Sequence, residues 1–232
     1  LAALIGSALL GRLQAADEAG VEEPLRVGLA RTCITPEVPL WLHGYASKSR
    51  FRPFEGKLND LFAKALAIED ARGERAVLIT VDLCVLRAQE AKMLFSRVMK
   101  KTGLERRQLL VNFSHTHSGP ILGASDLDRY PMRDDEREAT LAYTERLCDR
   151  IAEVALAAVD DLRPARLDWG VGQCDFVRNR RLYDANGRYR GMGPNPDKAV
   201  DNTVPVIRVQ TPEGTLRAVV FGCACHPVTL GS

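Results

Sequence analysis

The chain has 232 residues, of which 46% are hydrophobic and 27% charged, a balance typical of a folded globular protein and not of a disordered tail or a fibre. Thirty-two basic residues against 30 acidic ones give a formal charge of +2, too small for the basic field that nucleic-acid binding requires. We therefore exclude nucleic acid as a partner and expect one domain over residues 25–232.

Residues 1–24 read as a leader that precedes the folded domain. Residues 1–10 form an apolar run of small residues that is too short to span a bilayer. Its composition is typical of a signal-peptide remnant, although Gln14 is unusual before a cut after Ala16. We expect a secreted or periplasmic protein, with a structural N-terminal helix as the alternative. The six cysteines leave the disulfide state open.

The first predicted elements are strands. Residues 27–35 are rich in β-formers and end at Pro36, which favours a first strand. Residues 61–69 and 76–83 are apolar runs that flank a polar turn sequence at residues 70–73. Asp and Gly in this turn suit a tight reversal, so the two runs are expected to form a hairpin.

Two helices are predicted by apolar residues at spacings of three and four. The first covers residues 88–101 and can end at Gly103 in a left-handed cap. The second begins near Asp134 and Asp135, acidic residues suited to a helix N-terminus, and stops before Pro164. Its apolar stripe consists of Leu147, Ile151, Val154, Ala155 and Ala158.

The C-terminal part is expected to contain further strands. Residues 166–172 predict a strand, residues 178–202 a Gly-, Asn- and Pro-rich loop, and residues 211–214 the turn of a second hairpin. The last strand is expected to run to His226. Strands paired by hairpins, with two helices between them, favour an α/β or α+β fold with a layered mixed β-sheet and flanking helices.

His115 and His117 follow a predicted buried strand at residues 109–113. Alternate side chains of an extended chain share a face, so both imidazoles can point into one cavity. Neutral imidazole suits zinc, and two ligands on one rigid strand end lose little entropy on binding. The alternative is that both histidines only form hydrogen bonds with the backbone of a turn. His226, which also ends an apolar strand, favours the metal site.

Other polar residues permit further interpretations. Cys223 and Cys225 could form a thiolate metal site with His226, but in a regular strand both would face away from this histidine. His43 has no visible partner in the sequence and is expected to be structural. Asp82 ends a buried strand and could accept a hydrogen bond that fixes a histidine tautomer.

The sequence Asn112-Phe113-Ser114-His115-Thr116-His117-Ser118-Gly119-Pro120 resembles the His-Thr-His-Ser-Gly-Pro signature of the neutral/alkaline non-lysosomal ceramidases. Three further segments resemble this family in the same order: Gly44-Tyr45-Ala46, Thr80-Val81-Asp82-Leu83 and Arg178-Asn179-Arg180. The resemblance extends from about residue 26 to the C-terminus and covers the front half of the family's catalytic domain.

The resemblance implies a zinc-dependent amide hydrolase that converts N-acylsphingosine to sphingosine and a fatty acid. It implies that His115 and His226 bind Zn2+ and that His117 and Arg180 are catalytic-site residues, with Arg180 on polar or anionic substrate atoms. An always-charged guanidinium suits that role, while a surface loop arginine is the alternative. A Glu, a Tyr and a Ser that complete the family's site would come after Ser232.

Some features leave other functions open. Ile121-Leu122 stands where the family often has two glycines, so another amide remains an alternative substrate. A non-catalytic fragment or binding module is a second alternative, because the remaining zinc ligands are missing. A metal-dependent phosphoesterase is the third, although such sites usually hold two metals. A lipid amide substrate would bring peripheral membrane contact, and the oligomeric state stays open.

Overall fold

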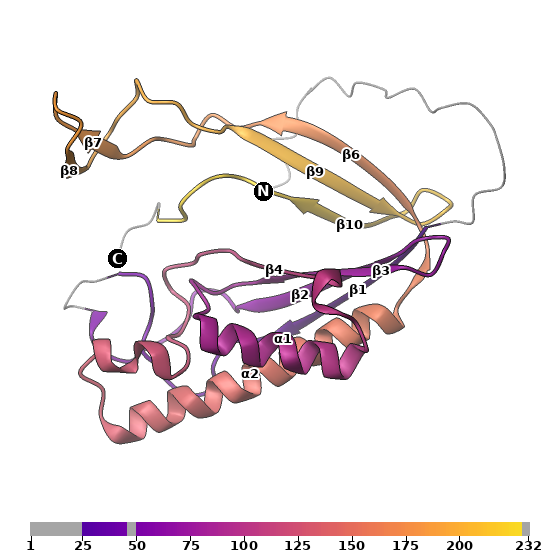
Figure 1. The fold of residues 1–232 in the computed structure, drawn as a ribbon, viewed down its shortest axis with the longest axis horizontal. Helices are drawn as coiled ribbons and strands as arrows, with labels where there is room; N and C mark the ends of the chain where they lie inside the picture. The colour runs from indigo at the N-terminus through magenta and orange to yellow at the C-terminus, as the bar shows by residue number, and fades with distance from the viewer. Residues whose placement is uncertain (1–24, 46–49, 229–232) are drawn as a thin grey trace. The chain divides into compact units, whose positions relative to one another are not determined.

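The structure, a computed structural model, describes residues 25–45 and 50–228 (Figure 1). The predicted leader therefore lies outside the described residues. Within the predicted domain the described chain divides into two units. The N-terminal unit consists of residues 25–165 with residues 227–228, and the C-terminal unit consists of residues 166–226.

A mixed sheet of five strands forms the centre of the N-terminal unit. Its strands are β1 (Arg26–Cys33), β2 (Phe62–Glu69), β3 (Arg75–Val81), β4 (Leu109–Phe113) and β5 (Arg163–Pro164), in the order β4-β3-β2-β1-β5. The pairing of β3 with β4 is parallel and the other pairings are antiparallel. The predicted hairpin of β2 and β3 is confirmed, and the Asp70 carboxylate holds its turn by accepting the amides of Arg72 and Glu74.

Two helices, α1 (Ala88–Thr102) and α2 (Asp134–Asp160), cover one face of this sheet (Figure 1). As predicted, Gly103 ends α1 in the left-handed region, with φ 72°. At the start of α2 the Glu136 carboxylate accepts the Arg133 amide at 2.9 Å, which satisfies an N–H group that has no partner within the helix. The predicted stripe of α2 is buried and packs in the main core. Two short 3₁₀ helices, η2 (Arg106–Gln108) and η3 (Ala124–Arg129), complete the unit.

The C-terminal unit contains a three-stranded antiparallel sheet in the order β10-β9-β6. Its strands are β6 (Arg166–Gln173), β9 (Thr203–Gln210) and β10 (Leu216–Phe221), and the predicted hairpin of β9 and β10 is confirmed. A separate two-stranded hairpin is formed by β7 (Arg181–Tyr183) and β8 (Tyr189–Met192). Of the described helices, none is long and apolar enough to cross a membrane.

Two expectations for this unit are wrong. The predicted loop at residues 178–202 contains the β7–β8 hairpin, whose strands are too short to show an alternating pattern; the Asp184 carboxylate holds its turn by accepting two backbone amides at 2.9 Å. The last strand ends at Phe221 and not at His226. The Gly222 amide still bonds the Pro205 carbonyl of β9 at 3.0 Å, but the Cys225 amide bonds the Cys223 carbonyl at 2.9 Å, so the chain turns there and does not continue along β9.

Gly28 lets β1 approach the end of α2. A Cβ atom at this position would lie 1.8 Å from the carbonyl oxygen of Ala158 and 2.9 Å from the backbone nitrogen of Leu162. Both neighbours are backbone atoms, which cannot rotate away as a side chain can. The packing of helix on sheet therefore requires glycine here.

We expect Gly28→Ala to lower the free energy of unfolding by about 3 kcal/mol, the upper end of the usual cost of overpacking a core. Urea unfolding followed by circular dichroism measures this change. Gly56→Ala is the matched control, because a Cβ atom there would meet no heavy atom within 4 Å. Equal stabilities of the two variants would contradict the proposed constraint.

Candidate metal centre

The segment that carries His115 and His117 leaves the sheet at the end of β4. The Ser114 amide still bonds the Val81 carbonyl at 3.0 Å, but His115 then adopts φ 57°, the one positive φ of a non-glycine residue in the part of the chain that the structure describes. This conformation costs roughly 1–2 kcal/mol for an L-residue. The strand-alternation argument therefore does not apply here, because the chain turns at His115.

The two imidazoles nevertheless converge. The Nε2 atoms of His115 and His117 lie 3.4 Å apart, and the ring planes meet nearly at right angles. Two nitrogens of a tetrahedral zinc site with Zn–N of about 2.0–2.1 Å are about 3.3–3.4 Å apart. The spacing of this histidine pair thus fits two groups around one zinc ion.

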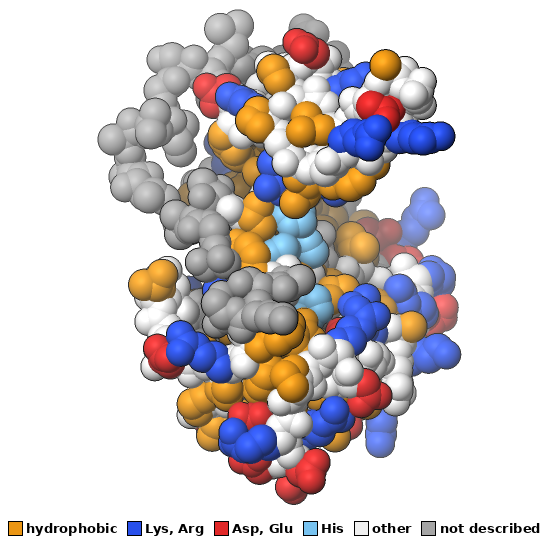
Figure 2. All heavy atoms as spheres, turned by 90° about the vertical axis from the view of Figure 1, so that its left-hand side faces the viewer, with side chains coloured by type: hydrophobic (Ala, Val, Ile, Leu, Met, Phe, Trp, Pro, Cys, Tyr) orange, Lys and Arg blue, Asp and Glu red, His pale blue; other side chains and the backbone are white. Residues whose placement is uncertain are grey.

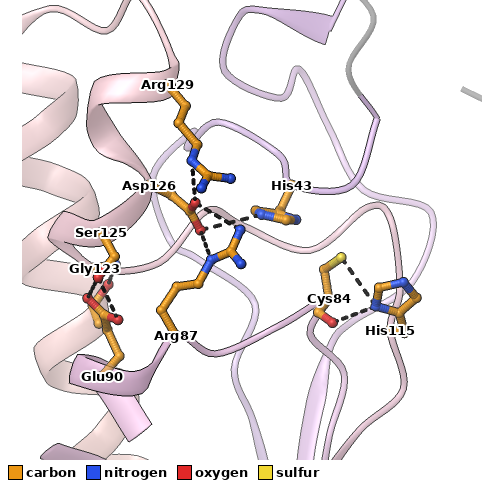
Figure 3. A network of polar contacts seen from close by, with 10 residues as sticks. His43, Cys84, Arg87, Glu90, His115, Gly123, Ser125, Asp126 and Arg129 are labelled. Carbon is orange, nitrogen blue, oxygen red and sulfur yellow. Dashed lines mark hydrogen bonds and ion pairs between the residues drawn. The ribbon is translucent and has the colours of Figure 1, made fainter.

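The orientation of His115 is set by Cys84, which follows β3. The Nδ1 atom of His115 lies 2.8 Å from the Cys84 carbonyl oxygen and 3.6 Å from its sulfur (Figure 3). With the proton on Nδ1, this nitrogen donates to the carbonyl and the Nε2 atom faces His117. A backbone acceptor behind a metal-binding histidine fixes both ring orientation and tautomer.

Cys84 also brings a thiol close to the pair. Its sulfur and one ring nitrogen from each of His115 and His117 all lie within 4.8 Å of one another. Burial raises the pKa of the Cys84 thiol, which keeps the sulfur protonated at neutral pH. Because the sulfur lies beside Nδ1 and not Nε2, we assign Cys84 the role of orienting His115 through its carbonyl group.

His117 packs against the segment that contains Gly44 and Tyr45. A Cβ atom at Gly44 would lie 2.4 Å from the Cγ atom of His117, and the φ of 112° also favours glycine. The Tyr45 ring meets the imidazole edge-on, with centroids 4.9 Å apart, and Arg50 donates to the His117 carbonyl at 3.1 Å. These contacts hold the histidine in place.

Asp126 of η3 gathers three basic side chains although it is only 2% exposed. Arg87 donates two hydrogen bonds to its carboxylate at 3.0 and 3.1 Å, and Arg129 lies 3.4 Å away (Figure 3). The Nε2 atom of His43 lies 3.5 Å from the same carboxylate. His43 thus has an acidic partner that no sequence spacing indicated, because the two residues are far apart along the chain.

Burial lowers the pKa of His43 below its ordinary value of 6.5, and the positive charge of Arg87 acts in the same direction. The negative charge of Asp126 opposes this shift without overcoming it. His43 is therefore a neutral imidazole at pH 7. Its Nδ1 atom is buried and has no hydrogen-bond partner among the described residues.

The other predicted site residues have different positions. Asp82 does not fix a histidine tautomer: its carboxylate accepts the Phe62 amide at 2.9 Å at the start of β2, and the Cys84 carbonyl bonds the histidine instead. His226 and Arg180 belong to the C-terminal unit, so their roles at this centre stay predictions. His226 is exposed, while Arg180 is half-buried and accepts a hydrogen bond from the Gly193 amide at its carbonyl.

A cavity of about 530 Å³ opens beside His117. Its lining is largely apolar and includes Leu42, Tyr45, Phe54, Leu58 and Leu61. This volume is within the usual range of about 300–1,000 Å³ for small-molecule sites. Histidine side chains are visible on the face drawn in Figure 2, where acidic and basic side chains are interspersed.

Comparisons with known proteins show that the chain is related to neutral ceramidases. No family model matches it. Neutral ceramidase A of Dictyostelium discoideum is 27% identical over 181 residues, which cover 70% of this chain and 23% of the relative. Neutral ceramidase B of the same organism is 24% identical over 189 residues, which cover 73% of this chain and 24% of the relative. The chain thus spans about a quarter of the length of these relatives.

Two solved structures share the fold. The neutral ceramidase from Pseudomonas aeruginosa superimposes with a TM-score of 0.69 at 23% identity, over 89% of this chain and 32% of that protein. A ceramidase complexed with C2 gives a TM-score of 0.68 at 24% identity, with the same coverage. These likenesses and the mixed five-stranded sheet with its two flanking helices confirm the predicted α+β fold class.

The lowered pKa of His43 predicts a pH-dependent stability of the metal-free protein. Since the unfolded chain takes up a proton at this residue before the folded chain does, the contribution is present above pH 6.5 and is lost as the pH falls below 6.5. We expect the urea midpoint to fall more between pH 7.5 and 5.5 in wild type than in His43→Gln. Equal pH dependence in both proteins would refute the assignment.

Proposed function

We propose that this chain, which is related to the neutral ceramidases, carries metal-binding histidines of an amide hydrolase. The observation that carries the proposal is the convergence of His115 and His117, with Nε2 atoms 3.4 Å apart, on the segment that resembles the family signature. The Nε2 atom of His115 suits zinc, and the short separation keeps the His117 ring within reach of a group bound there.

In this proposal His115 binds zinc through Nε2 and His226 supplies a second ligand. Bound zinc supplies a Lewis acid for the amide carbonyl and lowers the pKa of water toward about 7. The Cys84 carbonyl accepts a hydrogen bond from the protonated Nδ1 atom of His115, so that the Nε2 atom carries the lone pair. A metal binds the neutral imidazole, whose second nitrogen carries no proton. The arrangement therefore supports metal binding through Nε2.

His117 is proposed to carry a proton between the attacking water and the leaving amine. A histidine can both accept and donate a proton near neutral pH, and this one lies beside the proposed ligand His115. Arg180 is proposed to hold an oxygen atom of the substrate through its guanidinium. Both roles extend the family resemblance to this chain.

The cavity beside His117 supports a substrate with an apolar part. Leucine, phenylalanine and tyrosine side chains line it, so an acyl chain could be buried there with its amide close to the histidines. We propose N-acylsphingosine as the substrate, with water as the second reactant and a fatty acid and sphingosine as products. A secreted or periplasmic location and contact with a membrane surface belong to the same proposal.

Metal content tests the ligand assignment. We expect one zinc ion per chain in the purified wild type and its loss in His115→Ala and His226→Ala, measured by elemental analysis alongside circular dichroism to verify folding. His43→Gln is the matched histidine control and should retain zinc, because its Nε2 atom faces Asp126. A folded wild-type protein that binds no zinc would exclude a competent metal site in this chain.

The role of His117 is tested by separating turnover from metal content. We expect His117→Ala to reduce hydrolysis of N-acylsphingosine by about 10²–10⁴-fold, the usual contribution of a general acid–base group, and to change zinc content less than about twofold. Fatty-acid release measures turnover. Equal losses of zinc and activity in this variant would make His117 a ligand instead.

The substrate class is tested with the wild type. Hydrolysis of a phosphate ester but not of N-acylsphingosine would favour the phosphoesterase alternative.

A further inference from the structure

Two cysteines of the C-terminal unit lie in contact although they are far apart in the sequence. The sulfur atoms of Cys174 and Cys223 are 3.7 Å apart. Cys174 directly follows β6, and Cys223 lies two residues after β10, so both leave the same end of the three-stranded sheet. The contact lies within one unit.

The backbone on either side holds this contact. The Cys174 amide donates to the Asn202 carbonyl at 2.9 Å, which fixes Cys174 beside the start of β9. On the other side, the Gly222 amide donates to the Pro205 carbonyl at 3.0 Å and keeps the chain before Cys223 paired to β9. Because both strands are anchored to β9, the thiols stay close without any movement of the sheet.

The pair differs in exposure from the other cysteines, while burial and the neighbouring Cys174 thiol raise the pKa of Cys223 too. Cys174 and Cys223 are half-buried, which leaves their sulfur atoms open to a small oxidant. Cys84 and Cys148 are buried in the N-terminal unit, and burial raises the pKa of Cys148 to about 12. The thiols of these two buried residues are therefore poor nucleophiles.

We propose that Cys174 and Cys223 form a disulfide bond when the protein meets a small-molecule disulfide such as oxidised glutathione. One cysteine thiolate attacks the oxidant and releases one thiol, and the second thiolate then displaces the other half of the oxidant. The net reaction converts two cysteine thiols and one disulfide oxidant into one protein disulfide and two small thiols. Bond formation brings the sulfur atoms from 3.7 Å to about 2.05 Å.

The bond would join two segments that carry predicted site residues. Cys174 precedes the segment with Arg178 and Arg180, and Cys223 precedes His226. The bridge would therefore hold the chain before the proposed zinc ligand against the segment that carries the proposed substrate arginine. An exported protein would meet the oxidising conditions that preserve such a bond. The bond itself does not depend on the proposed hydrolase activity, so either proposal can fail alone.

The test counts thiols in the folded protein after incubation with oxidised glutathione, followed by denaturation at low protein concentration. We expect the wild type to change from six free thiols to four, with the loss of two hydrogen atoms in its mass and a protease-derived peptide pair that links Cys174 to Cys223. A glutathione adduct would instead add mass, which separates it from the internal bond.

Single substitutions distinguish this pair from other cysteines. Cys174→Ser and Cys223→Ser should form no internal bond, whereas Cys33→Ser, which removes an exposed thiol of the N-terminal unit, should lose two thiols as the wild type does. A peptide that links Cys174 to Cys225 would overturn the assignment. Retention of both thiols under oxidation that modifies the exposed Cys33 would overturn the proposal as a whole.

Discussion

The hydrogen bond between the His115 ring and the Cys84 carbonyl is the contact on which the candidate centre depends. It joins the segments that leave β3 and β4, which are parallel neighbours and therefore end at the same edge of the sheet. The turn at His115 costs conformational energy, and this bond, with the Ser114 amide on Val81, helps to hold it. The result is a ring whose Nε2 atom faces His117.

Near this bond lies the buried carboxylate of Asp126, whose charge is balanced by arginine side chains. His43, which faces the same carboxylate, is neutral. A buried carboxylate without such partners would be costly. On the other side, Gly44 admits the His117 ring at a distance that no side chain would permit. The proposed metal site would therefore depend on the same packing and polar contacts that stabilise the fold.

The predicted site residues of the C-terminal unit lie outside its three-stranded sheet. Cys174 directly follows β6, Arg180 directly precedes β7, and His226 lies beyond the end of β10. A cross-link between Cys174 and Cys223 would reduce the freedom of these segments without changing the sheet. A disulfide stabilises a fold mainly by lowering the conformational entropy of the unfolded chain.

Local pattern alone determined much of the fold. The β2–β3 hairpin, both helices and the buried stripe of α2 follow from residue spacing and turn chemistry, and the proximity of His115 and His117 follows from their neighbouring positions. The tertiary structure decided which groups surround them: Cys84 behind His115, Asp126 beside His43 and Cys174 beside Cys223. These contacts join distant segments through strand register and the close packing of loops, which one sequence does not encode in any local spacing.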